Sequence, residues 1–226
     1  MYKFLYYAIF LIVVFVILFL LSKLRRKTTQ ELEKILYFQN NPKLYLQLLK
    51  NPMLKILYRK SMLLQFELDA YLLLGDDSRV EDIISLLDGT PLTKGESLEF
   101  CQKELSYFCT VGKRVEAEPV LQRIESILSK VKGDKAEFIR KESKMIFDIY
   151  IRRDTNLIEE LEQAQMNEQG TTRGLTLYRL AKLNFFDHNA QKARTYLIRA
   201  KELLANTAWA DIVESALKDM SVLNYK

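Results

Sequence analysis

Side chains that commonly perform catalysis or hold metals are scarce in this chain. Its single histidine, His188, stands between Asp187 and Asn189, a sequence typical of a turn between two helices. One histidine without clustered cysteines offers no zinc site. The two cysteines, Cys101 and Cys109, would lie about 12 Å apart along one helix, which is too far for a disulfide. We expect buried free thiols in a reducing compartment.

Sequence motifs of enzymes are also missing. The seven glycines form no phosphate-binding loop, and no serine stands in a Gly-x-Ser-x-Gly motif. Neither cysteine has a histidine nearby in sequence that could activate it. The acidic run Glu159, Glu160 and Glu162 is most simply the exposed face of a helix. We therefore expect no enzyme, no cofactor and no metal; the alternative is an active site assembled from scattered carboxylates.

An unbroken apolar run extends from Phe4 to Leu21 without charge, glycine or proline. At about 1.5 Å per residue, it is long enough to span the roughly 30 Å hydrocarbon core of a bilayer. A helix satisfies its own backbone hydrogen bonds there, as lipid requires. We expect a single transmembrane helix. A packed core helix is the plain alternative, although few soluble helices are apolar on every face.

Basic residues give this segment an orientation. Lys23, Arg25, Arg26 and Lys27 follow the run, whereas Lys3 is the only charged side chain before it. Because cationic flanks stay on the cytoplasmic side, we expect the amino terminus outside and the rest of the chain in the cytosol. A cleaved signal peptide is the alternative, but such a peptide carries its positive charge first and ends at small residues.

Charge separates the expected anchor, residues 1–27, from the rest of the chain. All 34 basic residues except five lie after residue 27, and all 29 acidic residues do. The part after residue 27 is therefore formally neutral, and the net charge of +5 belongs to the membrane flank, where it can meet anionic headgroups. A neutral domain lacks the electrostatic attraction on which nucleic-acid binding depends.

Residues 28–52 are expected to form a helical neck. Thr28 or Thr29 can cap its first helix, and two pairs, Asn41-Pro42 and Asn51-Pro52, mark tight corners around a second short helix. Three leucines of that second helix need cover from the long helix that follows: Leu44, Leu48 and Leu49.

Helical periodicity continues through residues 53–226. Turns at Gly75, Gly112, Asp154 and Asp187 are 37, 42 and 33 residues apart. Such periods predict an all-α solenoid of about four stacked hairpins, in which no unit buries its apolar face alone. The expected helices are 53–74, 79–88, 97–110, 115–131, 134–152, 157–166, 172–186 and 190–204, with a last helix at 209–223 as a cap.

Small residues in the fourth hairpin carry a family resemblance. Leu180-Ala181, Ala193, Leu197 and Ala200 fall at the intervals of the tetratricopeptide repeat signature. Ala181 and Ala193 would lie where the two helices approach most closely, with Leu197 beside them. Asn184 departs from the signature, because it stands where the family usually has an aromatic residue.

The second hairpin matches this signature in part. Phe108, Ala117, Leu121 and Ile124 stand at corresponding intervals, but Leu105 occupies a position where a small residue is expected. The other two hairpins match only in length. Over residues 53–207, the chain therefore resembles a degenerate tetratricopeptide array with one convincing repeat.

The resemblance implies a superhelix whose first helices line a concave face that holds a peptide or a helix of another protein. Candidate groove residues on those helices are Gln65, Tyr107, Lys144, Tyr178 and Lys182. The alternatives are that the tyrosines pack between repeats and that the lysines are ordinary solvated charges.

Two functions fit these features. The first is a membrane-anchored adaptor or scaffold that displays the helical array at the cytoplasmic face and binds a protein partner there. The second is an accessory subunit of a membrane complex, recruited through its transmembrane helix. That helix has only Ala8 and Ser22 as small residues, so tight pairing through small-xxx-small spacing is not favoured.

Overall fold

Every regular element in the described part of the chain is helical. The structure, a computed structural model, describes residues 2–207 and 209–225, and it leaves out the side chains of 2–6, 8 and 9. No strand occurs in these ranges, so the predicted all-α class is confirmed. Contacts divide the chain into two compact units, Met1–Thr90 and Pro91–Lys226, whereas the sequence suggested boundaries after residues 27 and 52.

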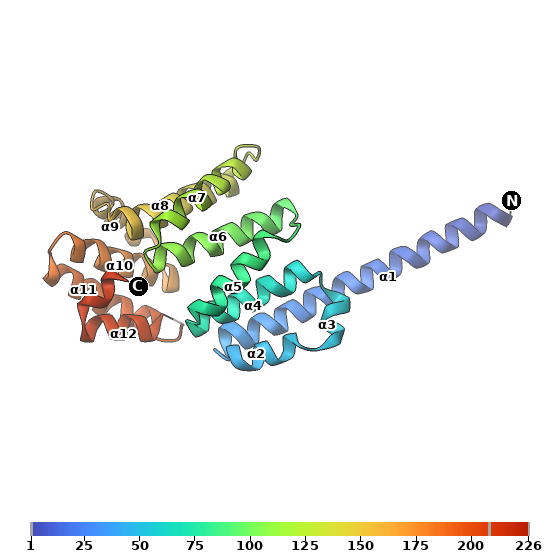
Figure 1. Ribbon diagram of the computed structural model, residues 1–226, viewed down its shortest axis with the longest axis horizontal. Coiled ribbons are helices and arrows are strands. Elements are labelled where there is room, and N and C mark those ends of the chain that lie inside the picture. The colour runs from blue at the N-terminus through green and yellow to red at the C-terminus, as the bar shows by residue number, and fades with distance from the viewer. Residues whose placement is uncertain (1, 208, 226) are drawn as a thin grey trace. The chain divides into compact units, whose positions relative to one another are not determined.

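Within its described residues, the first unit contains five α-helices (Figure 1). Their bounds are α1 Tyr2–Glu33, α2 Pro42–Leu49, α3 Pro52–Leu57, α4 Lys60–Leu74 and α5 Asp77–Asp88, with a π-helical turn at Lys34–Phe38. The predicted Asn-Pro corners are confirmed. The side-chain oxygens of Asn41 and Asn51 accept hydrogen bonds from the backbone N–H groups of Leu44 and Met53, at 3.1 and 2.9 Å.

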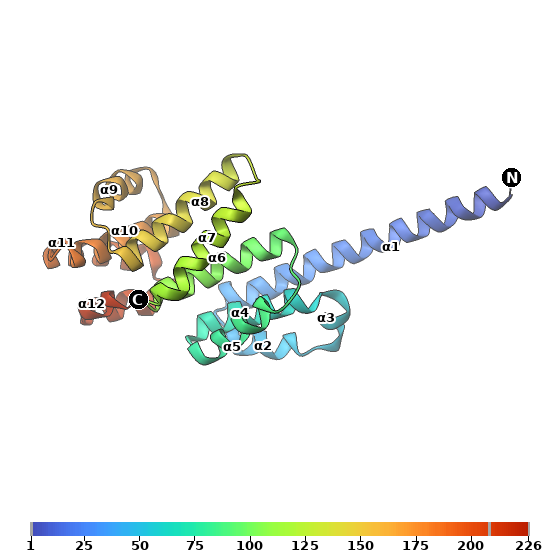
Figure 2. The ribbon, with the colours of Figure 1, turned by 45° about the horizontal axis from the view of Figure 1, so that its top comes forward.

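α1 continues through the predicted cap at Thr28 or Thr29. It runs from Tyr2 to Glu33 as one helix, which two views show as a single rod (Figures 1 and 2). The expected start of a new helix at these threonines is wrong, because no glycine or proline between residues 22 and 33 interrupts the helix already under way.

The predicted helix 53–74 is broken into α3 and α4 at Tyr58. Tyr58 and Arg59 have extended backbones, with φ and ψ of −119° and 149° for Tyr58 and −69° and 153° for Arg59. No glycine or proline marks this break in the sequence. The corner turns the Tyr58 side chain into the core, where it is only 4% exposed.

The end of α1, the neck and α4 share one apolar core. Its buried residues are Leu32, Leu36, Tyr45, Leu49, Leu54, Leu57, Tyr58 and Ala70. The neck therefore packs on the long helix that follows it, as predicted. Only Leu49 of the three neck leucines gains the expected cover, since Leu44 and Leu48 remain exposed.

The second unit contains seven α-helices within its described residues. Their bounds are α6 Lys94–Thr110, α7 Arg114–Leu128, α8 Asp134–Phe147, α9 Leu157–Asn167, α10 Gly170–Phe186, α11 Ala190–Leu204 and α12 Ala210–Lys218, with a π-helical turn at Asp148–Arg152 and a 3-10 helix at Met220–Asn224. The last helix expected at 209–223 is thus two elements, separated at Asp219. α7 passes through Pro119 without a break, as predicted.

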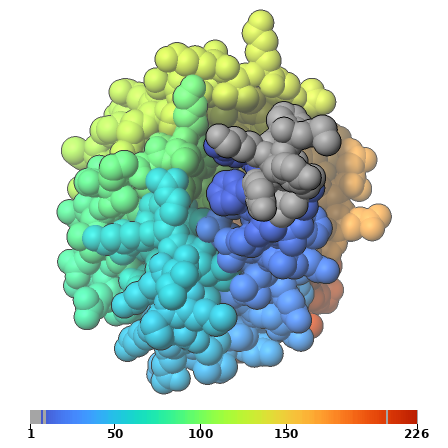
Figure 3. Space-filling model, turned by 90° about the vertical axis from the view of Figure 1, so that its right-hand side faces the viewer, coloured from blue at the N-terminus to red at the C-terminus, as the bar shows by residue number. Residues whose placement is uncertain are grey.

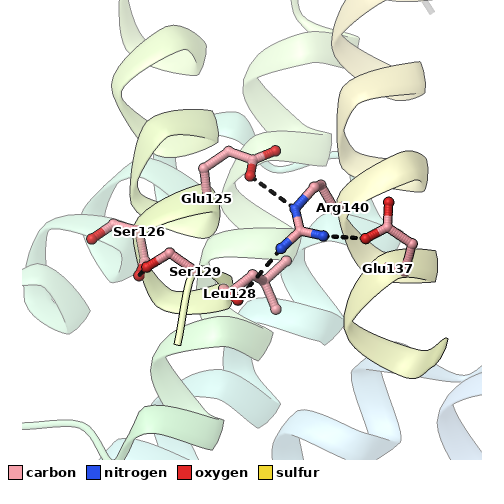
Figure 4. Close-up of polar contacts among 6 residues, drawn as sticks. All are labelled: Glu125, Ser126, Leu128, Ser129, Glu137 and Arg140. Carbon is pink, nitrogen blue, oxygen red and sulfur yellow. Dashed lines mark hydrogen bonds and ion pairs between the residues drawn. The ribbon is translucent and has the colours of Figure 1, made fainter. Parts of the chain in front are cut away.

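Neighbouring helices of this unit pack in sequence order. α6 packs on α7, α10 on α11, and α8 on both α6 and α7. α9 packs mainly on α10 rather than on α8, its expected partner. Arg140 on α8 joins α7 through Nε, which donates to Glu125 at 3.1 Å, and through a second nitrogen, which donates to the carbonyl oxygen of Leu128 at 3.4 Å (Figure 4).

The tightest helix pair is α10 with α11. Ala181, Ala193 and Leu197 are fully buried, as residues at a close approach of two helices would be. A Cβ atom added to Gly174 would lie 2.7 Å from Cγ of Leu204, so a larger residue there would force the two helices apart.

Candidate functional site

The exposed half of α1 carries a run of exposed apolar side chains. Every residue from Phe10 to Leu21 is exposed except Val14, which is half-buried. Phe15 is the extreme, at 71% exposed. Because these side chains point in all directions around one helix, the surface encircles α1 instead of forming a stripe.

No helix among the residues that the structure describes is both long and apolar enough to cross a membrane. The predicted span from Phe4 to Leu21 falls partly outside those residues, because the side chains of 4–6, 8 and 9 are not described.

Directly after this apolar half, α1 is bonded to the corner between α3 and α4. The Tyr58 hydroxyl donates to the main-chain carbonyl of Arg25 at 2.9 Å and lies 2.9 Å from Oγ1 of Thr29. The ring also meets Phe66 edge to face, with centroids 5.3 Å apart. Figure 3 shows α1 side chains (blue) packed beside those of residues 50–60 (cyan).

The four residues of the basic flank, Lys23, Arg25, Arg26 and Lys27, all have exposed side chains. They occupy the same turns of α1 that Tyr58 holds. The packed part of the first unit therefore begins at the level of the cationic flank.

Four of the five candidate groove residues are buried. Gln65, Tyr107, Tyr178 and Lys182 are 3%, 5%, 0% and 1% exposed, and only Lys144 is exposed. Tyr178 packs on Trp209 with ring centroids 5.3 Å apart. Because these four side chains are buried, they are not accessible to a partner, and the two tyrosines fit the alternative of packing residues.

Lys182 is the most unusual of these buried groups. Its ammonium donates to the carbonyl oxygen of Leu223 at 2.6 Å and lies 4.7 Å from the ring centre of Tyr150 and 5.5 Å from that of Phe186. Burial, helped by the nearby Arg153 charge, lowers the pKa of Lys182 to about 7. Burial also raises the pKa of Tyr150 to about 12.

Beside Lys182, a surface pocket of about 510 Å³ opens between two turns. The residues that line it are Arg153, Phe185, Phe186, His188, Ala190 and Asn224. The guanidinium of Arg153 stands 4.6 Å from the ring centre of Phe186. A cation, an imidazole and two phenyl rings together suit a ligand with an anionic group beside an apolar one.

Two lining residues of this pocket have left-handed backbones. Arg153 has φ of 56° and His188 has φ of 58°, each just beyond the end of a helix. Glycine usually occupies such positions, because the Cβ atom of other residues makes the left-handed conformation unfavourable. Both turns therefore carry a side chain where the backbone alone would favour glycine.

Sequence reasoning placed His188 in a turn and missed the pocket. The available signal was that Arg153 and His188 occupy corresponding turns of successive hairpins. Stacked hairpins bring such turns to one edge.

The described residues form no metal-binding site and no activated thiol. No group of three His, Cys, Asp or Glu side chains there could hold a metal ion. Cys101 and Cys109 are both buried, and they are not joined in a disulfide. Burial raises the pKa of Cys109 to about 12, so its sulfur stays a protonated, weakly nucleophilic thiol.

Comparisons with known proteins add no assignment to these sites. The chain matches no protein-family model, no curated protein and no solved structure.

Proposed function

We propose that the protein is a membrane-anchored interaction module. The observation that carries this proposal is α1, whose exposed apolar side chains encircle the helix from Phe10 to Leu21. In water, such a surface would be unfavourable by roughly 25 cal/mol for each Å² of apolar area. Together with residues 4–9 of the sequence, the run is about 27 Å long, which suits a bilayer core.

The exposed cations Lys23, Arg25, Arg26 and Lys27 orient this anchor. By the positive-inside rule, the amino terminus lies outside and residues 28–226 lie in the cytosol. There the helices after residue 53 form a tetratricopeptide-like solenoid that recruits or scaffolds a protein partner. Tethering raises the effective concentration of the module at the membrane.

Within this proposal, the Arg153–His188 pocket replaces the buried groove as the place of contact. It offers accessible charge and aromatic surface, whereas substitutions at Tyr107 or Tyr178 would disturb the packed interior. An acidic side chain or chain end with an apolar neighbour is the partner chemistry that this pocket suits.

The anchor is tested by placing charge inside the apolar run. Ile12→Lys with Phe15→Lys should release the chain from membranes washed with urea at neutral pH, since each lysine at the helix centre costs about 2.5–3.5 kcal/mol. Phe38→Lys, at an equally apolar and exposed position outside the run, is the control and should stay in the pellet. A wild-type chain that is extracted as readily as the double variant would overturn the anchor.

The pocket is tested by crosslinking in native membranes from a photoreactive group at Ala190. Arg153→Gly and His188→Gly remove the side chains, and glycine adopts the left-handed backbone conformation without steric cost. A defined crosslinked protein should be lost in these variants and kept in Lys135→Ala, an exposed lysine elsewhere in the second unit. Unchanged crosslinking in both glycine variants would contradict the pocket's role.

The accessory-subunit function makes a different prediction for the same crosslink. If recruitment depends on recognition of α1 in the bilayer, replacing residues 4–21 with an unrelated apolar helix of equal length will abolish the crosslink. An adaptor will keep its partner, because there the helix serves only as a tether.

A further inference from the structure

α3 carries two apolar faces, and only one of them is packed. Leu54 and Leu57 lie three residues apart and are buried in the core of the first unit. Met53 and Ile56 also lie three residues apart, but they are 61% and 86% exposed. Positions three apart share a side of a helix, so α3 holds the core with one side and presents Met53 and Ile56 on another.

The position of α3 along α1 is set by Tyr58, the residue that ends it. Tyr58 is bonded to the carbonyl of Arg25, four residues after the apolar run ends at Leu21. Four residues of helix rise about 6 Å. The headgroup layer on each side of a bilayer is also roughly 5–7 Å thick. If α1 spans the bilayer, the end of α3 therefore lies at headgroup depth.

Positive charge around α3 also fits a position in the headgroup layer. Lys50, Lys55 and Lys60 flank or belong to α3 and have exposed side chains. The acidic group that faces this cluster, Glu67, is half-buried. Exposed apolar side chains between cations match the boundary between acyl chains and anionic headgroups.

Not every exposed apolar residue of the first unit has this placement. Phe38 is as exposed as Ile56, at 86%, but it lies 13 residues beyond Arg25 along the same helical rod. That separation corresponds to roughly 20 Å, well outside the headgroup layer.

From this geometry we infer that the α3 corner is a second membrane contact, in which Met53 and Ile56 enter the lipid interface and Lys50, Lys55 and Lys60 meet anionic headgroups. This inference rests on the proposed anchor. A single helix leaves its domain free to swivel and tilt, whereas a second contact beside it fixes which side of the first unit faces the bilayer.

The test measures the depth of a fluorescent label on the full chain in vesicles of phosphatidylcholine and phosphatidylglycerol. Single cysteines are introduced as Ile56→Cys, Phe15→Cys or Phe38→Cys and labelled in the folded state. Cys101 and Cys109 are each 1% exposed, so the unaltered chain gives the background. Quenchers are attached to the lipid either near the headgroup or deep in the acyl chain.

We expect the label at Ile56 to lose fluorescence to the shallow quencher, the label at Phe15 to the deep one, and the label at Phe38 to neither. Quenching at Phe15 without quenching at Ile56 would overturn the second contact and leave the anchor standing. Loss of quenching at Phe15 would overturn the anchor and the contact together. Equal quenching at Ile56 and Phe38 would also contradict a contact specific to α3.

Discussion

The hydroxyl of Tyr58 donates a hydrogen bond to the main-chain carbonyl of Arg25, 33 residues earlier, at a distance of 2.9 Å. This bond connects the end of α3 to the turn of α1 that follows the apolar run. The same hydroxyl lies 2.9 Å from Oγ1 of Thr29, so one buried side chain sets the position of the α3 corner along α1.

Removing this hydroxyl should loosen the corner without unpacking it. Tyr58→Phe keeps the ring against Phe66 and loses the polar contacts, which should lower the free energy of unfolding by about 1 kcal/mol. Tyr58→Ala also leaves a cavity and should cost about 3–5 kcal/mol. Urea unfolding of the full chain in detergent, followed by circular dichroism, measures both. Equal losses in the two variants would show that ring packing contributes nothing.

The buried ammonium of Lys182 should give the second unit a distinctive pH dependence. Folding lowers its pKa to about 7, so between pH 7 and about 10 the unfolded chain binds more protons than the folded chain. Lys182 should therefore make the free energy of unfolding rise with pH in this window, by at most ~1.4 kcal/mol per pH unit, and this contribution should level off below pH 7. Unfolding midpoints measured at several pH values test the slope.

Lys182→Met should remove this slope, and Lys144→Met, which changes an exposed lysine, should preserve it. The series should stop near pH 8.5, because above the ordinary cysteine pKa of about 8.5 the raised pKa of Cys109 makes stability fall, and the raised pKa of Tyr150 does the same above about pH 10. An identical slope in the two methionine variants would show that Lys182 keeps its ordinary pKa in the fold.

Gln65 should be a site where a natural polar residue lowers stability. Its Oε1 atom is buried and has no hydrogen-bond partner. Gln65→Met keeps the length and flexibility of the side chain and removes the unpaired oxygen, so the free energy of unfolding should rise by about 1–3 kcal/mol. A thermal melt is sufficient to see this gain. A lower melting temperature in the variant would mean that the amide makes a stabilising contact after all.

Two neighbouring cations on α8 should differ in how much their ion pairs stabilise the fold. Arg140 is 30% exposed and bonds Glu125, Glu137 and the Leu128 carbonyl (Figure 4). Lys141 is 67% exposed and makes one pair, with Glu160. Arg140→Ala should lower stability by about 1 kcal/mol, whereas Lys141→Ala should change it by less than ~0.5 kcal/mol, because exposed single pairs are screened by water and salt. Thermal melts of both variants at low and high salt measure these losses of stability. Similar losses in the two variants would contradict this ranking.

Much of the helical framework could be predicted from local patterns. The apolar run from Phe4 to Leu21, the caps at Asn41 and Asn51 and the burial of Ala181 and Ala193 all depend on residues within one helix or one hairpin. Such short-range preferences do not depend on tertiary contacts, so they can be predicted from the sequence directly.

Burial of particular polar groups was decided by tertiary structure. In an array whose helices are covered on more than one side, periodicity does not reveal which polar position faces a neighbour. Gln65, Tyr178 and Lys182 were therefore expected in a groove, although the fold buries all three. Only the packing of α10 against later residues placed Leu223 within reach of the Lys182 ammonium.

Composition and periodicity by themselves determined that this chain is helical, that it begins with a long apolar helix and that its charge gathers after that helix. The tertiary structure alone decided where Tyr58 breaks the helix to reach Arg25, and that Arg153 and His188 line one pocket. The physical reason is range. Helix formation depends on neighbours three or four residues away, whereas these arrangements bring together positions 33 and 35 residues apart and exist only after packing.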